Sequence, residues 1–262
     1  MTASHRFVCM QIIAFWPVWL WYGQRMLDRS DEPWGILALA TVLFIVAQKR
    51  TGHIVSRRAL IIATTLTLIY AVTFALLPPL LRAIVAVLAI AVTLSGIGYG
   101  RTLQAGVAGL LLLSLPLIAS LQFYGGFPIR AITAFFSSGL LQLIDYDVQP
   151  QGTLLFWQGE VIAVDAPCAG IKMLWTALYL NFTLAAWRDL GLLATWLSTS
   201  VTMFSVFIGN VLRSTLLFFT ESGIINAPDI AHSLIGIIVF ALVASAVLGF
   251  HQCNGRATPC AV

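Results

Sequence analysis

Charged residues are scarce in this chain of 262 residues, since Asp, Glu, Lys and Arg together make up only 9% of it. A soluble domain of similar length carries roughly a quarter of its residues as charged ones. Hydrophobic residues account for 60% of the chain, more than an aqueous fold of this size can bury. The composition therefore predicts a protein whose solvent is mostly lipid.

Several signals of other protein classes are also missing. No dense run of Lys and Arg with interleaved aromatic residues occurs, so the net charge of +4 does not indicate a nucleic-acid partner. The four cysteines include no Cys-x-x-Cys pair, and no Cys/His cluster has the spacing of zinc ligands. The cysteines therefore do not indicate a zinc site. The first apolar stretch is a Trp-rich anchor followed by charged residues, which does not fit a cleavable signal peptide.

Long apolar runs divide the chain into about eight segments that could cross a membrane. Each approaches the ~20 residues that a hydrocarbon layer of about 30 Å requires. We therefore predict an all-α polytopic protein that forms a single membrane domain over residues 1–262. The predicted spans are approximately 7–23, 34–48, 59–77, 80–98, 105–124, 171–187, 191–219 and 232–250.

The placement of basic residues predicts the orientation of these spans. Segment 49–58, between the second and third spans, holds four basic residues, and such loops stay in the cytoplasm. Alternation of the spans then puts both termini inside. We expect an integral protein of the cytoplasmic (inner) membrane, with its functional face at the outer, periplasmic leaflet. The outside segments are 24–33, 78–79, 125–170 and 220–231.

One outside segment is long enough to hold structure of its own. Residues 127–144 have the pattern of an amphipathic or interfacial helix. Two short strand-like runs follow, 153–157 and 161–164, with a turn signal between them. We expect segment 125–170 to form a small extracytoplasmic helix and a β-hairpin or meander before the sixth span.

Cys168 is the only cysteine that this topology places outside. Pro167 stops the preceding strand, and a helix is predicted to begin just after the cysteine. Free N–H groups and the helix dipole favour an anion at such a position, which is one way to make a thiol nucleophilic. Lys172, one turn further on, adds positive potential. A small buried residue in a tight turn is an equally good interpretation of this position alone.

Two further polar residues belong to the same leaflet. Arg213 lies in an apolar helix, where a guanidinium costs roughly 2.5–3.5 kcal/mol on insertion scales and is a candidate functional group by default. Asn210 lies three residues earlier, on the same helix face. His232 is the only outside histidine and suits a proton-transfer role beside a thiol. The alternatives are that Arg213 snorkels or pairs with Glu221, and that His232 merely caps the last helix.

Three short motifs occur in a fixed order: Cys168-Ala169-Gly170, Asn210 to Arg213, and His232 to Gly236. They resemble the Cys-small-Gly, Asn-x-x-Arg and His-x-x-x-Gly motifs of the exosortase/archaeosortase family, over roughly residues 140–245. The first motif of the family is usually Cys-Ser-Gly. Ala169 replaces the serine here, which leaves the nucleophile intact and the subfamily open.

The resemblance implies a membrane cysteine transpeptidase with sortase-like chemistry on an unrelated fold, and no cofactor. Such an enzyme cleaves the C-terminal sorting signal of a membrane-tethered protein and passes the protein to an acceptor. The signal consists of a short motif (Pro-Glu-Pro in the type substrate), a transmembrane helix and a basic tail. By this resemblance the catalytic residues are Cys168, Arg213 and His232, supported by Asn210, Gly170, Gly236 and Asp165.

Without the family resemblance, the residues are also compatible with other functions. A transporter or channel is compatible with eight spans and an intramembrane arginine, although no inverted repeat and no paired broken helices are evident. A non-catalytic factor for polysaccharide or pilus export is compatible with the same topology. A membrane hydrolase would use the same site with water as the acceptor.

Overall fold

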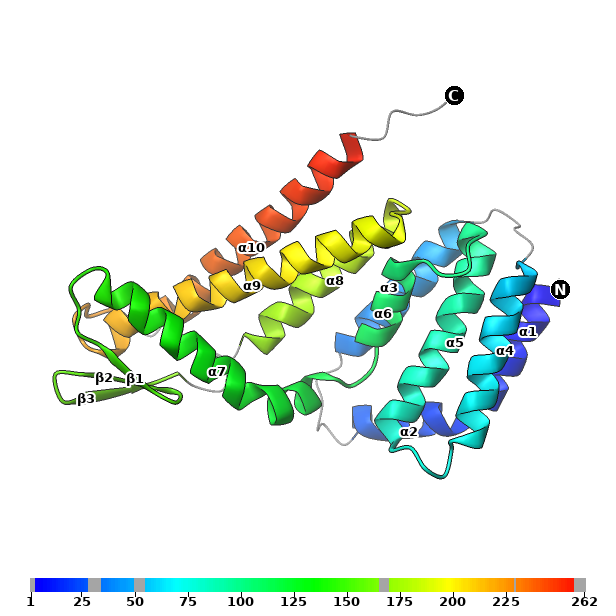
Figure 1. Cartoon of the computed structure of the whole chain (residues 1–262), viewed down its shortest axis with the longest axis horizontal. Coiled ribbons are helices and arrows are strands. Elements are labelled where there is room, and N and C mark those ends of the chain that lie inside the picture. Colours follow the sequence, from blue (N-terminus) through cyan, green and yellow to red (C-terminus); the bar gives the residue numbers. More distant parts are fainter. Residues whose placement is uncertain (1–2, 28–33, 50–54, 165–169, 229, 257–262) are drawn as a thin grey trace. The chain divides into compact units, whose positions relative to one another are not determined.

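The computed structural model describes residues 3–27, 34–49, 55–164, 170–228 and 230–256 (Figure 1). Helices dominate these ranges, which confirms the mostly helical class predicted from the sequence. Ten helices and three strands occur within the described ranges: α1 (Ala3–Ala14), α2 (Trp16–Leu27), α3 (Trp34–Gln48), α4 (Arg57–Val72), α5 (Pro79–Tyr99), α6 (Ala105–Leu113), α7 (Ile118–Gln142), β1 (Gln149–Gln151), β2 (Leu154–Trp157), β3 (Glu160–Ala163), α8 (Ile171–Trp187), α9 (Leu192–Glu221) and α10 (Ile230–Arg256).

Backbone packing divides the chain into two compact units. The first comprises Met1–Leu117 and Asn181–Leu197, and the second comprises Ile118–Leu180 and Ser198–Val262. The long helices α8 and α9 therefore contribute residues to both units. All the predicted site residues belong by sequence to the second unit.

The first predicted span, 7–23, consists of two helices instead of one. α1 and α2 are separated at Phe15. Pro17 supplies no N–H to a continuing helical ladder, and its ring crowds the preceding turn, so a single helix is interrupted there. Phe15 is fully buried and packs edge-to-face on Tyr70 of α4, with ring centroids 4.8 Å apart. The break therefore directs an aromatic side chain into the core of the first unit.

The predicted fifth span, 105–124, and the predicted interfacial helix, 127–144, both have different boundaries in the structure. α6 ends at Leu113, and α7 runs without interruption from Ile118. Pro116 lies between them, lacks an N–H and disfavours helical backbone in the residue before it. The two helices meet at 91°. Both predicted boundaries were wrong, because hydropathy registers an apolar run but not the proline that breaks it.

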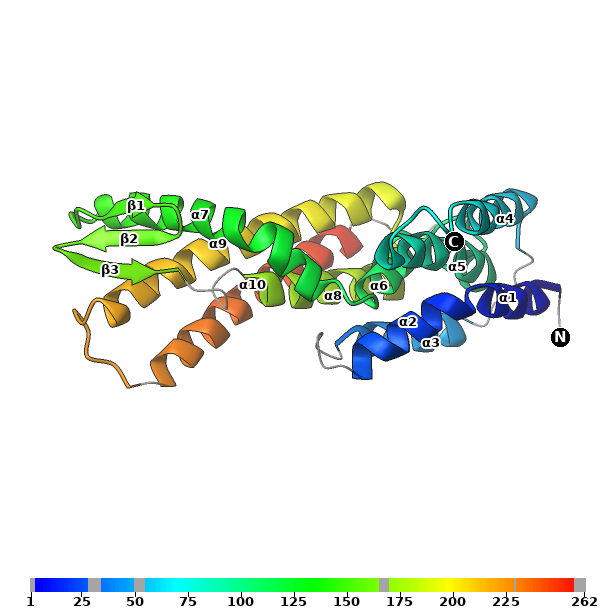
Figure 2. The ribbon, with the colours of Figure 1, turned by 90° about the horizontal axis from the view of Figure 1, so that it is seen from below.

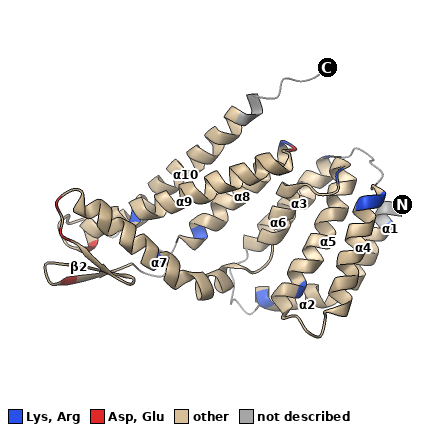
Figure 3. Ribbon diagram, viewed as in Figure 1, with Lys and Arg blue, Asp and Glu red and all other residues tan. Residues whose placement is uncertain are grey.

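Within the described ranges, α5, α9 and α10 are long and apolar enough to cross a membrane. The bent pair α6 and α7 adds a fourth crossing if it counts as one span. α3 is a shorter apolar helix, and α4 and α8 have 16 and 17 residues. Figure 3 shows few charged residues along α5, α9 and α10. The chain is an integral membrane protein with several candidate spans. Helix length alone supports fewer spans than the eight that the sequence predicts.

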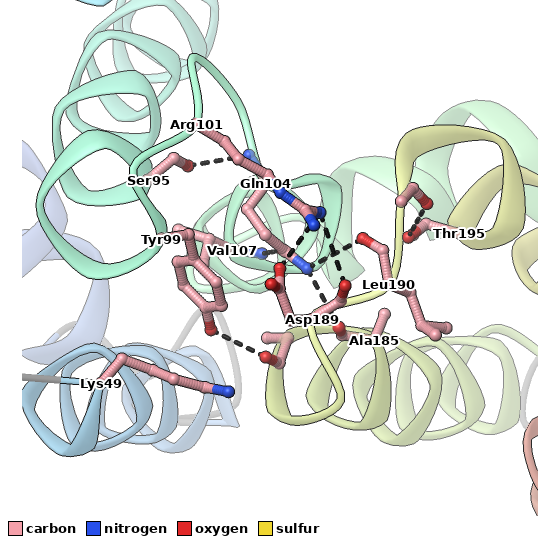
Figure 4. Close-up of polar contacts among 12 residues, drawn as sticks. Lys49, Ser95, Tyr99, Arg101, Gln104, Val107, Ala185, Asp189, Leu190 and Thr195 are labelled. Atoms are coloured by element: carbon pink, nitrogen blue, oxygen red, sulfur yellow. Dashed lines mark hydrogen bonds and ion pairs between the residues drawn. The ribbon is translucent and has the colours of Figure 1, made fainter. Parts of the chain in front are cut away.

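Polar side chains gather around the last turn of α8 in the first unit (Figure 4). A helix C-terminus leaves its final carbonyl groups short of intrahelical donors. Side chains from three other segments supply donors to these oxygens: Gln104 Nε2 to Ala185 at 3.0 Å, Tyr99 Oη to Ala186 at 2.8 Å and Lys49 Nζ to Trp187 at 3.1 Å. Arg101 Nη1 lies 3.1 Å from Asp189 Oδ1 just beyond the helix. Three turns that the predicted topology assigns to the cytoplasmic side thus meet at one point.

The three strands form an antiparallel meander in the order β1-β2-β3 (Figure 2). β2 and β3 confirm the predicted strand runs 153–157 and 161–164, and β1 adds a third strand. Gln158 and Gly159 form the turn between β2 and β3, with φ values of 50° and 87°. A type I′ turn requires positive φ at both central positions. The turn chemistry therefore sets the register of the hairpin that precedes the Cys-Ala-Gly motif.

Two apolar clusters position α9 within the second unit. The first packs the sheet on α7 and on the C-terminal part of α9. Phe218 of α9 is 1% exposed there, and its ring centroid lies 5.6 Å from that of Trp157 in β2. The second cluster joins α8, α9 and α10 through Ala177, Val206 and Val243. Because α9 is held by both clusters, its polar residues have defined neighbours on α7, α8 and α10.

Candidate active site

Gly170 closes the Cys-Ala-Gly motif and immediately precedes α8. Cys168, Ala169 and Asp165 lie outside the described residues. The φ of Gly170 is 71°, a left-handed conformation that glycine adopts far more readily than other residues. A Cβ added to Gly170 would lie 2.8 Å from Cγ and from Oδ1 of Asn210. The backbone that follows Cys168 in the sequence therefore requires glycine for two independent reasons.

Asn210 holds its side-chain amide between Gly170 and α7. It is 4% exposed, and its Nδ2 donates to Thr133 Oγ1 at 3.0 Å. One turn along α7, the Ser137 hydroxyl donates to the carbonyl oxygen of Val211 at 3.2 Å. Asn210 Oδ1 is buried and has no hydrogen-bond donor among the described residues. An unsatisfied buried acceptor costs about 1–3 kcal/mol, so its presence beside Gly170 marks a candidate functional position.

Arg213 lies three residues after Asn210 and is half-buried in the C-terminal half of α9. Its guanidinium lies against Gly236 of α10. A Cβ built on Gly236 would be 3.5 Å from Arg213 Nε and 3.8 Å from Cζ and Nη2. These are ordinary van der Waals distances, so a Cβ at this position would fit beside the guanidinium. α9 thus presents Asn210 to the glycine of the first motif and Arg213 to the glycine of the third.

His232 lies one helical turn before Gly236 and therefore on the same face of α10. Its Nδ1 lies 3.5 Å from Oε1 of Glu221, the last residue of α9. The side chains of His232 and Glu221 are 43% and 53% exposed, so solvent screens their interaction. Glu221, which the sequence suggested as a partner of Arg213, lies close to the histidine in the structure.

A small cavity of about 30 Å³ lies beside His232. β2, β3 and the residue after β3 form one side of it, and α9 and α10 form the other. Ser214, Glu221 and His232 supply its polar lining. The cavity therefore connects the candidate histidine with the strand that leads toward Cys168 in the sequence.

Thr133 is the residue of this arrangement that the sequence interpretation missed. It anchors Asn210 from α7, four residues before Ser137. Two buried hydroxyl residues at this spacing share one face of an apolar helix, which was the available signal. Within the part of the chain that the structure describes, no three His, Cys, Asp or Glu side chains come together as metal ligands would.

The fold and the site define an α-helical integral membrane protein in which the Asn-x-x-Arg motif contacts the glycines of the two other motifs. A comparison with protein families identifies the family within this class. The chain belongs to the transmembrane exosortase family (Exosortase_EpsH), whose model matches residues 2–249. A comparison with curated proteins and one with solved structures each gave no match. The resemblance drawn from the three motifs is thereby confirmed at the level of the family.

Proposed function

We propose that this protein cleaves the C-terminal sorting signal of membrane-tethered substrate proteins through a thioacyl intermediate on Cys168 and transfers them to an acceptor. Membership of the exosortase family implies a transpeptidase-type enzyme. The observation that carries the proposal is the contact of the Asn-x-x-Arg motif with Gly170 and Gly236. This contact links the backbone that follows Cys168 to the helix that carries His232.

In the proposed mechanism, the thiolate of Cys168 attacks the carbonyl carbon of the scissile peptide bond. A carbon–sulfur bond forms, and the carbonyl oxygen becomes the oxyanion of a tetrahedral intermediate. The carbon–nitrogen bond then breaks as protonated His232 transfers a proton to the departing amine. An acceptor nucleophile attacks the thioester and gives its proton to His232, and the carbon–sulfur bond breaks to restore the thiolate.

Arg213 supplies the positive charge of the proposed site. Its guanidinium donates several N–H groups in a rigid fork, which suits it to stabilise the oxyanion or to hold the substrate backbone. Its half-buried position strengthens its interaction with a developing negative charge relative to bulk water. Asn210 supports this arrangement through its hydrogen bond to Thr133 and its contact with Gly170.

The proposed topology has about eight crossings, both termini in the cytoplasm and the active site at the outer leaflet of the cytoplasmic membrane. The polar cluster around the end of α8 supports a common side for the turns that contain Lys49, Arg101 and Asp189. α8 begins directly after Gly170 and ends in that cluster. Its 17 residues extend over about 26 Å at 1.5 Å per residue, a length that slight thinning of the bilayer accommodates.

The decisive experiment is co-expression with a candidate substrate from the same organism that ends in a short motif, a transmembrane helix and a basic tail. We expect the wild type to generate a new substrate C-terminus, which mass spectrometry maps, and Cys168→Ala to leave the substrate at full length. Cys253→Ala is the matched control, because Cys253 is a free, exposed cysteine of α10. Unchanged processing by Cys168→Ala would rule out the thioacyl mechanism.

The mass of the product separates transfer from hydrolysis. A transferase leaves the substrate with the additional mass of its acceptor, whereas a hydrolase leaves a free carboxylate. The acceptor is part of the proposed reaction. Recovery of the free carboxylate alone, from membranes that contain all native acceptors, would therefore replace the transferase with a hydrolase that uses the same residues.

A further inference from the structure

β3 (Glu160–Ala163) is an edge strand, since β2 is its one partner in the described sheet. The backbone groups of successive residues point alternately to the two sides of a strand. The N–H of Val164 donates to the carbonyl oxygen of Thr153 at 2.9 Å. By this alternation the backbone groups of Ile162 also point toward β2. Val161 and Ala163 therefore direct their N–H and C=O groups away from β2, toward the open edge.

The open edge of β3 carries a charge only at its first residue, Glu160, and contains neither proline nor lysine. Native edges are blunted by proline, lysine, a bulge or a covering element. The opposite edge has such protection, because β1 contains Pro150 and packs against α7. On β3, Val161 is 54% exposed and Ala163 is exposed. Within the described ranges, no hydrogen-bond partner meets the outward backbone groups of these two residues.

The same edge adjoins the candidate active site. Ala163 and Val164 line the small cavity together with Glu221 and His232. The chain reaches Cys168 five residues after Ala163. A peptide that runs along β3 would therefore extend along the strand that leads in sequence to the proposed nucleophile, and one of its side chains would face the proposed proton donor.

We propose that β3 is the substrate-docking strand: an extended peptide segment of the membrane-tethered substrate adds to its open edge and pairs with the backbone of Val161 and Ala163. This inference rests on the proposed function. Main-chain pairing holds a peptide in the extended form that nucleophilic attack needs, and it leaves alternate side chains for recognition. The cavity beside His232, about 30 Å³ in volume, has room for one small group, so the docked segment carries a small residue at that position.

A proline at position 163 tests this pairing without breaking the sheet. Ala163→Pro removes an N–H that points to the open edge, so the ladder to β2 keeps its hydrogen bonds. The sheet already holds a proline in the equivalent situation. Pro150 pairs with Leu155, whose backbone groups turn toward Ile162 on the other side of β2, so no bond to β1 is lost.

We expect Ala163→Pro to slow processing of the co-expressed candidate substrate about tenfold or more. The reason is that a carbonyl oxygen of the docked substrate would lose the N–H of residue 163 as its hydrogen-bond donor. The unfolding temperature in detergent should stay within a few degrees of the wild type. The matched control, Pro150→Ala, restores an outward N–H on the opposite edge and should leave processing within about twofold of the wild type. Normal processing by Ala163→Pro would overturn the docking proposal.

Cysteine crosslinking measures the pairing directly and does not depend on turnover. Val161→Cys and Ala163→Cys are each placed in a Cys168→Ala background without other cysteines. A single cysteine is then moved along the candidate substrate, residue by residue, before its transmembrane helix. Residues that face each other across a strand pair have Cβ atoms about 4.5–5.5 Å apart. We expect the substrate position that forms the strongest disulfide to differ by two residues between the two variants.

The outcomes separate docking from catalysis. A crosslinking profile that is flat, or the same for both variants, would overturn strand addition even if wild type processes the substrate and Cys168→Ala does not. If Cys168→Ala processes the substrate as well as the wild type, the proposed function fails and the docking proposal fails with it. A two-residue shift together with slow processing by Ala163→Pro supports both.

Discussion

The side-chain amide of Asn210 lies so close to Gly170 that a Cβ added to the glycine would be 2.8 Å from Cγ of the asparagine. Three residues further along α9, Arg213 lies beside Gly236 of α10, where an added Cβ would be at an ordinary contact distance of 3.5 Å from Nε. The two polar residues of one motif thus lie beside two glycines, one just before α8 and one within α10. Motifs that are far apart in the sequence therefore lie close together in the second unit.

Replacement of Gly170 by alanine should lower processing at least about tenfold. The positive φ costs a non-glycine residue roughly 1–2 kcal/mol, and the added methyl group would clash with the side-chain amide of Asn210. Gly139→Ala in α7 is the control, because an added Cβ meets nothing within 4 Å there. Processing assays on purified variants with equal unfolding temperatures measure the effect. Full activity of Gly170→Ala would show that this contact has no part in the reaction.

Substitutions at Gly236 should have effects that grow with side-chain size. An alanine Cβ would lie 3.5 Å from Arg213 Nε, an ordinary contact, so Gly236→Ala should retain most activity. Gly236→Leu should displace the guanidinium, and misplacement by about 1 Å is enough for a loss of about 10²-fold. The control is Gly249→Leu on the same helix, where an added Cβ meets nothing within 4 Å. Equal rates for the two leucine variants would contradict a positioned Arg213.

Glu221→Gln should reduce processing by no more than about fivefold. The two side chains are 43% and 53% exposed, and exposed pairs contribute only about 0.2–1 kcal/mol. His232→Ala should abolish processing, because no other proton donor is proposed for the leaving amine. Single-turnover rates with the candidate substrate distinguish the two variants. A Glu221→Gln variant as inactive as His232→Ala would instead make the carboxylate part of the catalytic machinery.

Gln104→Ala should lower the free energy of unfolding by about 1–3 kcal/mol. Gln104 is 1% exposed, accepts from the N–H of Val107 at 2.8 Å and donates to the carbonyl oxygen of Ala185 at 3.0 Å. Its loss leaves the N–H of Val107 buried without this acceptor, while the carbonyl oxygen of Ala185 keeps the bond from the N–H of Leu190 at 2.9 Å. Gln252→Ala, at an exposed position of α10, is the control and should change stability little. Denaturant unfolding in detergent micelles measures the difference; equal midpoints would contradict a stabilising cap.

Most of the helical fold was predictable because hydropathy is a local property. The predicted boundaries of spans 34–48 and 171–187 coincide with those of α3 and α8. Segment 105–124 failed because Pro116 breaks a run that hydropathy treats as continuous. The β-meander was predictable because turn residues such as Gly159 punctuate short apolar runs. The number of spans was less predictable, because several of the apolar helices are shorter than a membrane crossing requires.

The candidate site was predictable in its residue types and less so in its contacts. The cost of a membrane arginine singles out Arg213 from sequence alone. Nothing local pairs Asn210 with Thr133, because the two residues are 77 positions apart and meet only when α7 packs on α9. The approach of Glu221 to His232 depends in the same way on how the end of α9 meets the start of α10.

The sequence by itself determined that this protein lies in a membrane and that it carries three short motifs resembling those of the exosortase family, because both depend on residue types along short segments. Only the tertiary structure decided that Asn210 meets Gly170, that Arg213 meets Gly236, and that β3 has an open edge beside His232. The physical reason is that such contacts depend on the packing of whole helices and on strand pairing, which join residues far apart in the chain.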